Sequence, residues 1–303
     1  MRQVLIKTFR QRYLFLMSVP FIIWLIVFYY IPIWGWSMAF QNFKLGRTFW
    51  EQEWVGLRFF RELWSDYRFW NAFRNTLGMS VLGLVTGTIF PIILALFINE
   101  IRFRGFKRTV QTISYLPHFI SWVVVSNMFH RMLSPDNGIV NDILRFVGAI
   151  DKPIHFMAMP SLFWGIITIA TLWKEIGWST IIYLAAIAGI DQELYEAATA
   201  DGCGRFKKMW HITIPSITPT VVVLFIMAFG RLTQIGLERQ MLMGNSMVQE
   251  VSEVIDLYAL KFGIGLGRFS FGTAVGVFNS MISLVLFVIA NTVFKRTSGK
   301  SVF

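Results

Sequence analysis

Long stretches without a charged residue divide this 303-residue chain. Six of them exceed the roughly 20 residues that a helix needs to cross the hydrocarbon core of a bilayer. They lie at 13–43, 75–99, 109–130, 153–173, 209–230 and 269–294. A seventh, at 176–190, is too short to cross alone, so we join it to the end of the fourth as one helix over 161–187, with Lys174 and Glu175 inside it. The pattern predicts an all-α polytopic membrane protein with six transmembrane helices.

The predicted spans also set an orientation. They cover 14–40, 75–98, 109–130, 161–187, 213–231 and 269–294. Because six is an even number, both termini lie on one side of the membrane. On that side 14 Lys and Arg fall within 56 residues, in the segments 1–13, 99–109, 190–212 and 295–303. The other side has 13 in 100 residues, in the segments 41–74, 131–158 and 231–268. Since short cytoplasmic loops carry an excess of Lys and Arg, we expect both termini in the cytoplasm.

Composition agrees with a membrane protein. Hydrophobic residues make up 55% of the chain and charged residues 15%, whereas soluble domains carry about 25% charged residues. A net charge of +11 can indicate nucleic-acid binding. Here the excess is spread over the loops that flank the spans, without a basic helix or an aromatic platform, so we expect no nucleic-acid partner. The single cysteine, Cys203, excludes an internal disulfide and a multi-cysteine metal site.

The N-terminus poses a choice between a signal peptide and a first transmembrane helix. Four basic residues precede an apolar run, as in a signal peptide: Arg2, Lys7, Arg10 and Arg12. The run continues through Phe40 with bulky residues and without a small-residue cleavage pattern. We therefore expect a retained helix.

The longer outer segments contain no catalytic pattern. Segment 41–74 mixes charges with many aromatic residues, which favours short interfacial helices in a membrane-surface belt over a ligand-binding platform. Segment 131–158 contains the turn sequence Ser134-Pro135-Asp136-Asn137-Gly138.

The cytoplasmic segment 190–212 is predicted to contain a short, capped helix. Asp191 can cap its N-terminus, and Glu193 in the first turn suits the helix dipole. Gly202 and Gly204 are expected to end or kink it, because glycine takes the positive-φ conformation of a helix C-cap. Three alanines leave its surface shallow enough for another backbone to approach: Ala197, Ala198 and Ala200. An interfacial amphipathic linker is the alternative reading.

The spacing of this segment favours a specific family. Glu196-Ala197-Ala198 is followed by three residues and Gly202, and then by nine residues and Ile212-Thr213-Ile214-Pro215. This pattern resembles the EAA loop of ABC importer permeases, in which the position of Ile214 is usually leucine. The loop also lies where the family has it, on the cytoplasmic side before the penultimate span.

Two further stretches narrow the resemblance. The sequences 181–187 and 251–256 look like those of carbohydrate-uptake permeases, in the subgroup that serves complex oligosaccharides. The resemblance covers about residues 10–298. It implies the type I ABC importer permease (MetI-like) fold, with a core domain over 75–294, in the inner or plasma membrane of a prokaryote.

The resemblance also implies a mechanism and partners. The loop helix would sit in a cleft of an ATPase subunit, with Glu196 facing a basic partner and Gly202 permitting the bend that follows. The ATPase-coupling set is Glu196, Ala197, Ala198, Asp201, Gly202, Ile212 and Pro215. The implied partners are a second homologous permease, an ATPase dimer, an extracytoplasmic solute-binding protein, membrane lipid and an oligosaccharide substrate.

The sequence contains neither a complete ATP-binding motif nor a set of residues with metal-ligand spacing. The only candidate phosphate loop, at Gly299-Lys300-Ser301, has Phe294 in place of the first glycine. Four scattered histidines do not have metal-ligand spacing. We therefore expect no cofactor on this chain and no catalysis by it, with ATP and Mg bound by the partner ATPase subunits.

Polar and aromatic residues in the spans are candidates for the substrate pathway, because charges inside a span usually face a partner or a water-filled cavity. The candidates are Trp173, Lys174, Glu175, Trp178, Arg231, Gln234 and Asn279. Packing or interface polarity is the alternative for each. Lys174 and Glu175 point about 100° apart on a helix, so we do not expect them to neutralise each other.

A stand-alone secondary transporter or a membrane-embedded enzyme is the alternative function. The first would be expected to use membrane carboxylates, and Glu175 is the only acid well inside a predicted span. The second would need a clustered His, Asp and Glu constellation, which the sequence lacks.

Overall fold

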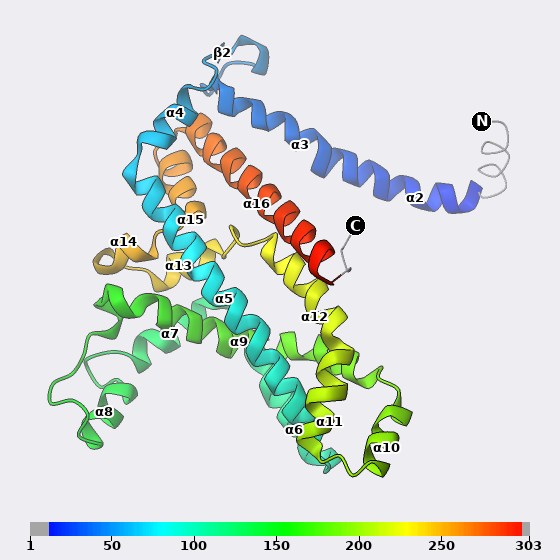
Figure 1. Cartoon of the computed structure of the whole chain (residues 1–303). Coiled ribbons are helices and arrows are strands. Elements are labelled where there is room, and N and C mark those ends of the chain that lie inside the picture. The colour runs from blue at the N-terminus through cyan, green and yellow to red at the C-terminus, as the bar shows by residue number, and fades with distance from the viewer. Residues whose placement is uncertain (1–11, 299–303) are drawn as a thin grey trace. The chain divides into compact units, whose positions relative to one another are not determined.

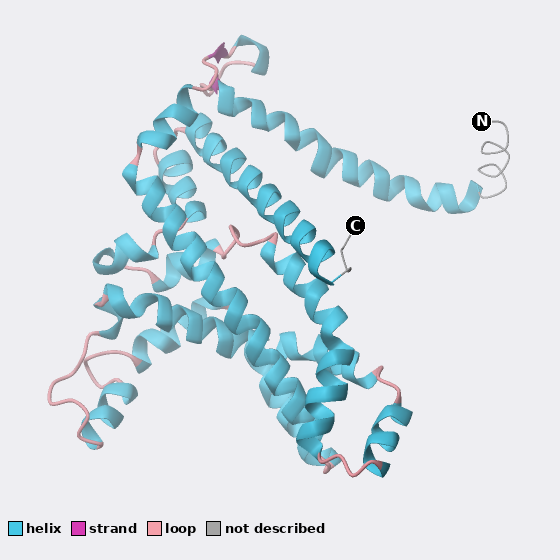
Figure 2. Ribbon diagram, viewed as in Figure 1, coloured by secondary structure: helices cyan, strands magenta, loops and turns pink. Residues whose placement is uncertain are grey.

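The computed structural model describes residues 12–298. The rejected phosphate-loop match at 299–301 and most of the basic N-terminal segment 1–13 lie outside the described residues. The chain divides into two compact units, one built from the residues up to Asp66 with Ala259–Phe278, the other from Tyr67–Tyr258 with the residues from Asn279 onward. Figure 2 shows that the described part is almost entirely helical.

The first unit begins with one long apolar helix. It runs over 12–40 as α2 (Arg12–Leu25), a π-helical turn (Ile26–Tyr30), α3 (Ile31–Ile33) and a 3-10 stretch (Trp34–Phe40). In its most apolar window no residue is buried against the protein. A helix that is apolar all round and unburied is suited to lipid, as the uninterrupted apolar run predicts.

The outer segment of this unit is fixed by polar contacts. Two short strands, β1 (Gln41–Asn42) and β2 (Glu53–Trp54), pair antiparallel, and α4 (Arg58–Ser65) follows. The Ser270 hydroxyl donates to the Gln41 carbonyl at 2.5 Å and accepts from the Phe43 amide at 2.9 Å. The segment predicted as interfacial helices therefore holds one such helix and also a strand pair.

The second unit contains the remaining helices. Their bounds are α5 (Tyr67–Glu100), α6 (Arg104–Tyr115), α7 (Trp122–Met132), α8 (Ile139–Phe146), α9 (Pro160–Ala188), α10 (Gln192–Ala200), α11 (Arg205–Lys208), α12 (Ile214–Phe229), α13 (Leu237–Met243) and α14 (Gln249–Ser252). Short α15 (Ile255–Ala259) and long α16 (Phe269–Ser298) each cross between the units. Helices α5, α9 and α12 pack side by side (Figure 1).

Helices α5 and α9 form the central pair and run in the same direction. The Trp164 ring lies against Gly78, where a Cβ would come within 2.5 Å of it. Further along, the Thr180 hydroxyl donates to the Pro91 carbonyl at 3.3 Å. Since α5 has 34 residues and is about 50 Å long, the pair connects two well-separated ends of the unit.

At the beginning of α5, polar side chains hold the stretch 250–255. The Asn75 amide donates to the carbonyls of Glu250 and Glu253 at 2.7 and 2.9 Å. The Thr76 hydroxyl accepts from the Ile255 amide at 3.0 Å. These residues overlap the stretch 251–256 that supports the family resemblance. Buried side chains of α5 thus form hydrogen bonds with the backbone of this stretch.

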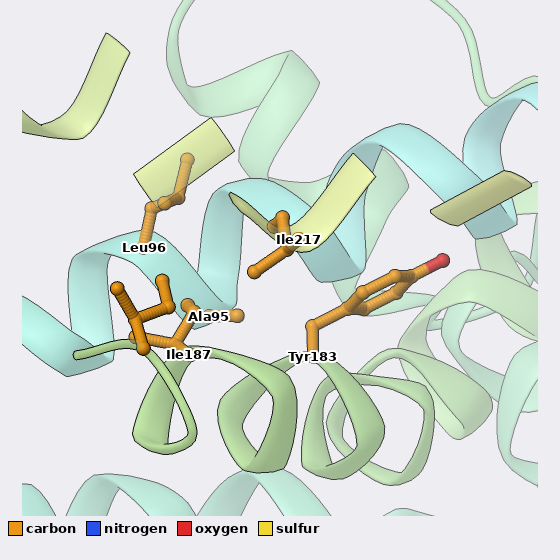
Figure 3. Packing of buried hydrophobic residues seen from close by; sticks show 6 residues of the cluster. Ala95, Leu96, Tyr183, Ile187 and Ile217 are labelled. Atoms are coloured by element: carbon orange, nitrogen blue, oxygen red, sulfur yellow. The ribbon is translucent and has the colours of Figure 1, made fainter. Parts of the chain in front are cut away.

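At the other end of α5 lies a hydrophobic cluster that joins three helices. Figure 3 shows Ala95 and Leu96 of α5 against Tyr183 and Ile187 of α9, with Ile217 of α12 closing the group. These side chains are buried. These ends of the three helices are therefore packed as one body.

The structure differs from the predicted third span over 109–130. In place of one helix it has α6, a 3-10 turn (Leu116–Phe119) and α7. Pro117 lacks the amide that an α-helix needs at that position. Ser121 then caps α7 by accepting from the Val124 amide at 3.4 Å.

Within residues 12–298, four helical segments are long and apolar enough to cross a membrane: Arg12–Phe40, Tyr67–Glu100, Arg205–Phe229 and Phe269–Val293. Helix α9 has 29 residues, but Lys174 and Glu175 lower its hydropathy. Together with the broken α6–α7 pair, this helix set is compatible with six crossings. Two predicted boundaries shift, because α5 begins eight residues before position 75 and the fifth span begins at Arg205, inside the predicted loop 190–212.

Gly177 provides a test of the packing between α6 and α9. A Cβ there would collide with the backbone of Ser114, whereas one at Gly165 of the same helix would meet nothing within 4 Å. We predict that Gly177→Ala lowers the thermal unfolding temperature of the purified protein, because overpacking costs about 1–3 kcal/mol. Gly165→Ala is the matched control and should leave this temperature unchanged or raise it. Equal unfolding temperatures for the two variants would contradict this packing.

Candidate coupling loop and membrane cavity

The loop helix α10 begins as the sequence predicts. Asp191 is the N-cap, with extended backbone angles, and its Oδ1 accepts from the Glu193 amide at 3.0 Å. Glu193 lies in the first turn. The prediction of a capped N-terminus is confirmed.

The end of α10 is a Schellman motif around Gly202. Gly202 has φ +73, the Cys203 amide donates to the Ala198 carbonyl at 2.8 Å, and the Gly202 amide donates to the Thr199 carbonyl at 3.0 Å. The predicted positive φ at Gly202 is confirmed. For Gly204 it is wrong, because this residue has φ −69 and is the N-cap of α11.

The residues predicted to contact an ATPase are mostly exposed. Glu196, Ala197, Asp201 and Gly202 are exposed, and Ala198 is half-buried. At the start of α12, Ile212 is half-buried against the hydrophobic cluster and Pro215 is exposed. Within the described part of the chain Glu196 has no hydrogen-bond or ion-pair partner, so its carboxylate is free to meet another protein.

Several contacts attach α10 to the three-helix core. The Tyr195 hydroxyl is 2.8 Å from Thr213 Oγ1, and Lys208 Nζ donates to Thr199 Oγ1 at 2.5 Å. Tyr195 also packs with Met209 and Ile212 against the buried cluster. Arg205 Nε, after the helix, lies 3.9 Å from Glu100 Oε2 at the end of α5. These contacts connect α10 to the core formed by α5, α9 and α12.

Lys174 and Glu175 stabilise the break between α6 and α7. Lys174 is buried, and its Nζ donates to the His118 carbonyl at 2.5 Å. His118 Nδ1 forms a 2.7 Å hydrogen bond with Glu175 Oε2. The broken helix exposes backbone carbonyls inside the protein, and such groups are costly unless a donor satisfies them.

The expectation that these two neighbours do not neutralise each other is wrong. Lys174 Nζ lies 3.5 Å from Glu175 Oε1. Their Cβ atoms diverge around the helix, but both side chains are long enough to converge beside His118.

The two candidate tryptophans of α9, Trp173 and Trp178, lie in different surroundings. Trp178 stacks on the His118 ring with centroids 4.4 Å apart and planes 4° apart. Trp173 instead lines an apolar cavity of about 440 Å³ with Phe129 and Ile169. The structure does not gather them into one sugar-stacking surface.

Arg231 and Gln234 line a larger cavity of about 470 Å³. Its wall comes from α5, α9, α12 and the segment after α12, and it includes Thr171 and Arg239. A second, small cavity of about 50 Å³ shares Thr171 and Arg239 and is also lined by Glu175. Three of the predicted pathway residues thus face two adjoining cavities.

Asn279 does not line either of these cavities. It is buried in α16, and its amide lies 3.5 Å from the Thr233 carbonyl. The Thr233 hydroxyl in turn pairs with Ser283 of the same helix. Asn279 therefore attaches α16 to the segment after α12.

Sequence reasoning missed His118 and Arg239. His118 was treated as a scattered histidine, because its link to Glu175 joins positions 57 residues apart. Arg239 fell in a predicted outer loop. Because the acidic Glu238 directly precedes it, nothing in the sequence marks Arg239 as an unpaired charge.

Comparison with known proteins places the chain in a family. A family model described as "Binding-protein-dependent transport system inner membrane component" matches residues 87–299. The chain is 40% identical over 302 residues to the polygalacturonan/rhamnogalacturonan transport system permease protein YteP of Bacillus subtilis (strain 168), covering 100% of this chain and 94% of YteP. Protein LplB of the same organism is 37% identical over 294 residues, covering 97% and 92%.

Solved structures agree with this assignment. The fold matches a chain of a bacterial ABC transporter involved in the import of the acidic polysaccharide alginate, with a TM-score of 0.89, 36% identity and coverage of 98% of this chain and 99% of that chain. It matches equally a chain of the bacterial alginate ABC transporter in complex with an alginate pentasaccharide-bound periplasmic protein, with a TM-score of 0.89 and 36% identity over 98% of each chain. The protein therefore belongs to the family of binding-protein-dependent transport system inner membrane components, the permease subunits of ABC transporters.

Proposed function

We propose that this chain is one permease of an ATP-driven importer that takes up oligosaccharides derived from complex polysaccharides. The proposal rests on the structure of α10. This helix is capped at both ends, exposes Glu196 and is attached to the core through Tyr195. The polysaccharide permeases among its relatives support the substrate class.

In the proposed mechanism α10 occupies a cleft of an ATPase subunit. Closure of the ATPase dimer displaces α10, and the Tyr195–Thr213 contact carries this motion into the helix that continues as α12. Because α12 packs with α5 and α9, the three helices move together and change access to the cavity beside Arg231. ATP hydrolysis occurs in the ATPase subunits, and this chain transmits force.

The proposal includes the other partners. A second homologous permease completes the pathway, and an extracytoplasmic solute-binding protein delivers the oligosaccharide. One related alginate transporter was solved with its periplasmic protein, which supports the latter partner. The chain spans the cell membrane of a prokaryote, with both termini in the cytoplasm.

The contacts of Glu175 disfavour the alternative of a stand-alone secondary transporter. Ion coupling needs a membrane carboxylate that can gain and lose its partner. Glu175 is instead engaged by His118 and Lys174 at the helix break.

The coupling role predicts the effect of changes at Gly202 and Glu196. A Cβ at Gly202 would meet nothing within 4 Å, so a side chain there disturbs only the left-handed backbone. Gly202→Val and Glu196→Lys should insert normally but abolish substrate-stimulated ATP hydrolysis by the reconstituted complex. Gly202→Asn is the matched control and should retain most of this stimulation, because asparagine tolerates the left-handed conformation. Unchanged hydrolysis in Gly202→Val and Glu196→Lys would overturn the coupling role.

The proposed orientation predicts how the native Cys203 reacts. In sealed cells a membrane-impermeant maleimide should leave Cys203 unlabelled, and it should label this half-buried residue once the cells are opened. A Ser134→Cys variant in a Cys203→Ser background is the control and should react from outside. Labelling of Cys203 in sealed cells would invert the topology.

A further inference from the structure

The cavity beside Arg231 has the size of a ligand site. Its volume of about 470 Å³ lies within the roughly 300–1,000 Å³ of small-molecule pockets. Apolar residues of α5, of α12 and of the segment after α12 form most of the wall, and the charged groups are Arg231 and Arg239. A mostly apolar wall with a few convergent polar groups is typical of a binding site.

Arg239 is the half-buried cation of this wall, whereas Arg231 is exposed. Its Nη1 donates to Thr171 Oγ1 at 3.0 Å. Its Nε is buried and has no hydrogen-bond partner among the described residues. In the part of the chain that the structure describes, no carboxylate lies within 4.0 Å of this guanidinium. A half-buried cation with a buried, unpaired N–H group is costly, which favours a ligand that completes its hydrogen bonds.

The charge on Arg239 persists at neutral pH. Burial lowers the pKa of Arg239 to about 10, partly offset by the negative charge of Glu175. Glu175 contributes only at a distance, because its oxygens are engaged by His118 and Lys174. The protein thus holds a protonated arginine at a cavity whose nearest acid is already paired.

We propose that Arg239 binds a carboxylate of the transported saccharide, so that this importer is selective for acidic oligosaccharides composed of uronic acids. The inference rests on the proposed function and names the substrate class of the same pathway. A guanidinium presents a planar fork of donors that matches a carboxylate. Exposed Arg231 and Gln234 add a second cation and an amide for neighbouring carboxylate and hydroxyl groups.

The depth of Arg239 favours a saccharide over a lipid headgroup as the source of the anion. Its partner Thr171 lies eleven residues into α9, which begins at Pro160. At 1.5 Å per residue this is about 16 Å along the helix. In the proposed topology α9 enters the membrane at Pro160, and the headgroup layer is only about 5–7 Å thick. A lipid phosphate would then have to leave its layer to reach Arg239.

The test uses the complete reconstituted transporter and two matched sugars. The first is an α-1,4-linked trigalacturonate, and the second is the same trimer with each carboxylate reduced to a hydroxymethyl group. Uptake into vesicles is measured with the binding protein, and the affinity of the purified permease–ATPase complex for each sugar is measured without it. Wild type is compared with Arg239→Gln and Arg239→Lys. Arg145→Gln, which removes an exposed arginine of α8, is the control.

We expect Arg239→Gln to lower trigalacturonate uptake and affinity about tenfold or more, as for the loss of a charged hydrogen bond. Arg239→Lys should lie between it and wild type, because lysine keeps the charge without the fork. Affinity for the reduced trimer should be unchanged in every variant. Basal ATP hydrolysis checks that each complex has assembled, and Arg145→Gln should match wild type.

The outcomes separate the two proposals. If the wild type imported the reduced trimer but not trigalacturonate, selectivity for acidic sugars would be refuted. The proposed import of oligosaccharides would not be affected. Full trigalacturonate uptake by Arg239→Gln, or equal losses for both sugars, would refute the role of Arg239. A wild-type complex that binds and imports neither sugar would count against the proposed oligosaccharide function, and the inference would fall with it. If vesicles made with anionic lipid restored trigalacturonate uptake by Arg239→Gln, the anion bound at this position would be a lipid headgroup and not the saccharide.

Discussion

The packing of α5, α9 and α12 around Ala95, Tyr183 and Ile217 is the contact on which the rest of the second unit depends. In a bilayer the hydrophobic effect does not drive helices together, so close side-chain packing and hydrogen bonds have to do so. Here the cluster lies where α10 joins the three helices. The same residues therefore stabilise the fold and connect α10 to the helices that line the cavity.

Several polar groups inside the second unit form hydrogen bonds with its backbone, and Arg239 differs from them. Asn75 and Thr76 satisfy the backbone near residue 253, and Lys174 satisfies the carbonyl of His118. Each of these groups compensates an irregular piece of chain that would otherwise leave backbone groups unpaired. Arg239 compensates nothing of this kind, and its guanidinium faces a cavity. This contrast separates polarity that supports the fold from polarity that is available to a substrate.

The features that could be predicted from the sequence are those set by neighbouring residues. Asp191 caps α10 because its carboxylate reaches an amide two positions away, and Gly202 ends the helix because glycine adopts a positive φ. The apolar runs likewise mark the long helices. The spacing from Glu196 to Pro215, which resembles the EAA loop, could be recognised for the same reason.

What the sequence did not reveal depends on residues that are distant along the chain. The break at Pro117 persists because Lys174 and Glu175, more than 50 positions away, satisfy it. Arg239 stands out only once α13 is placed against Thr171 of α9. Residue spacing does not encode such contacts.

Rigid attachment of α10 to the core is the central claim, and a distance measurement tests it most directly. Spin labels at Ala200 of α10 and Leu162 of α9, in a Cys203→Ser background, report the span between the loop and the far end of the core. Pulsed electron paramagnetic resonance on the reconstituted complex should give the same distance distribution without nucleotide and with ATP trapped. A distribution that shifts on ATP binding would show that α10 moves independently of α9 and would contradict force transmission through this cluster.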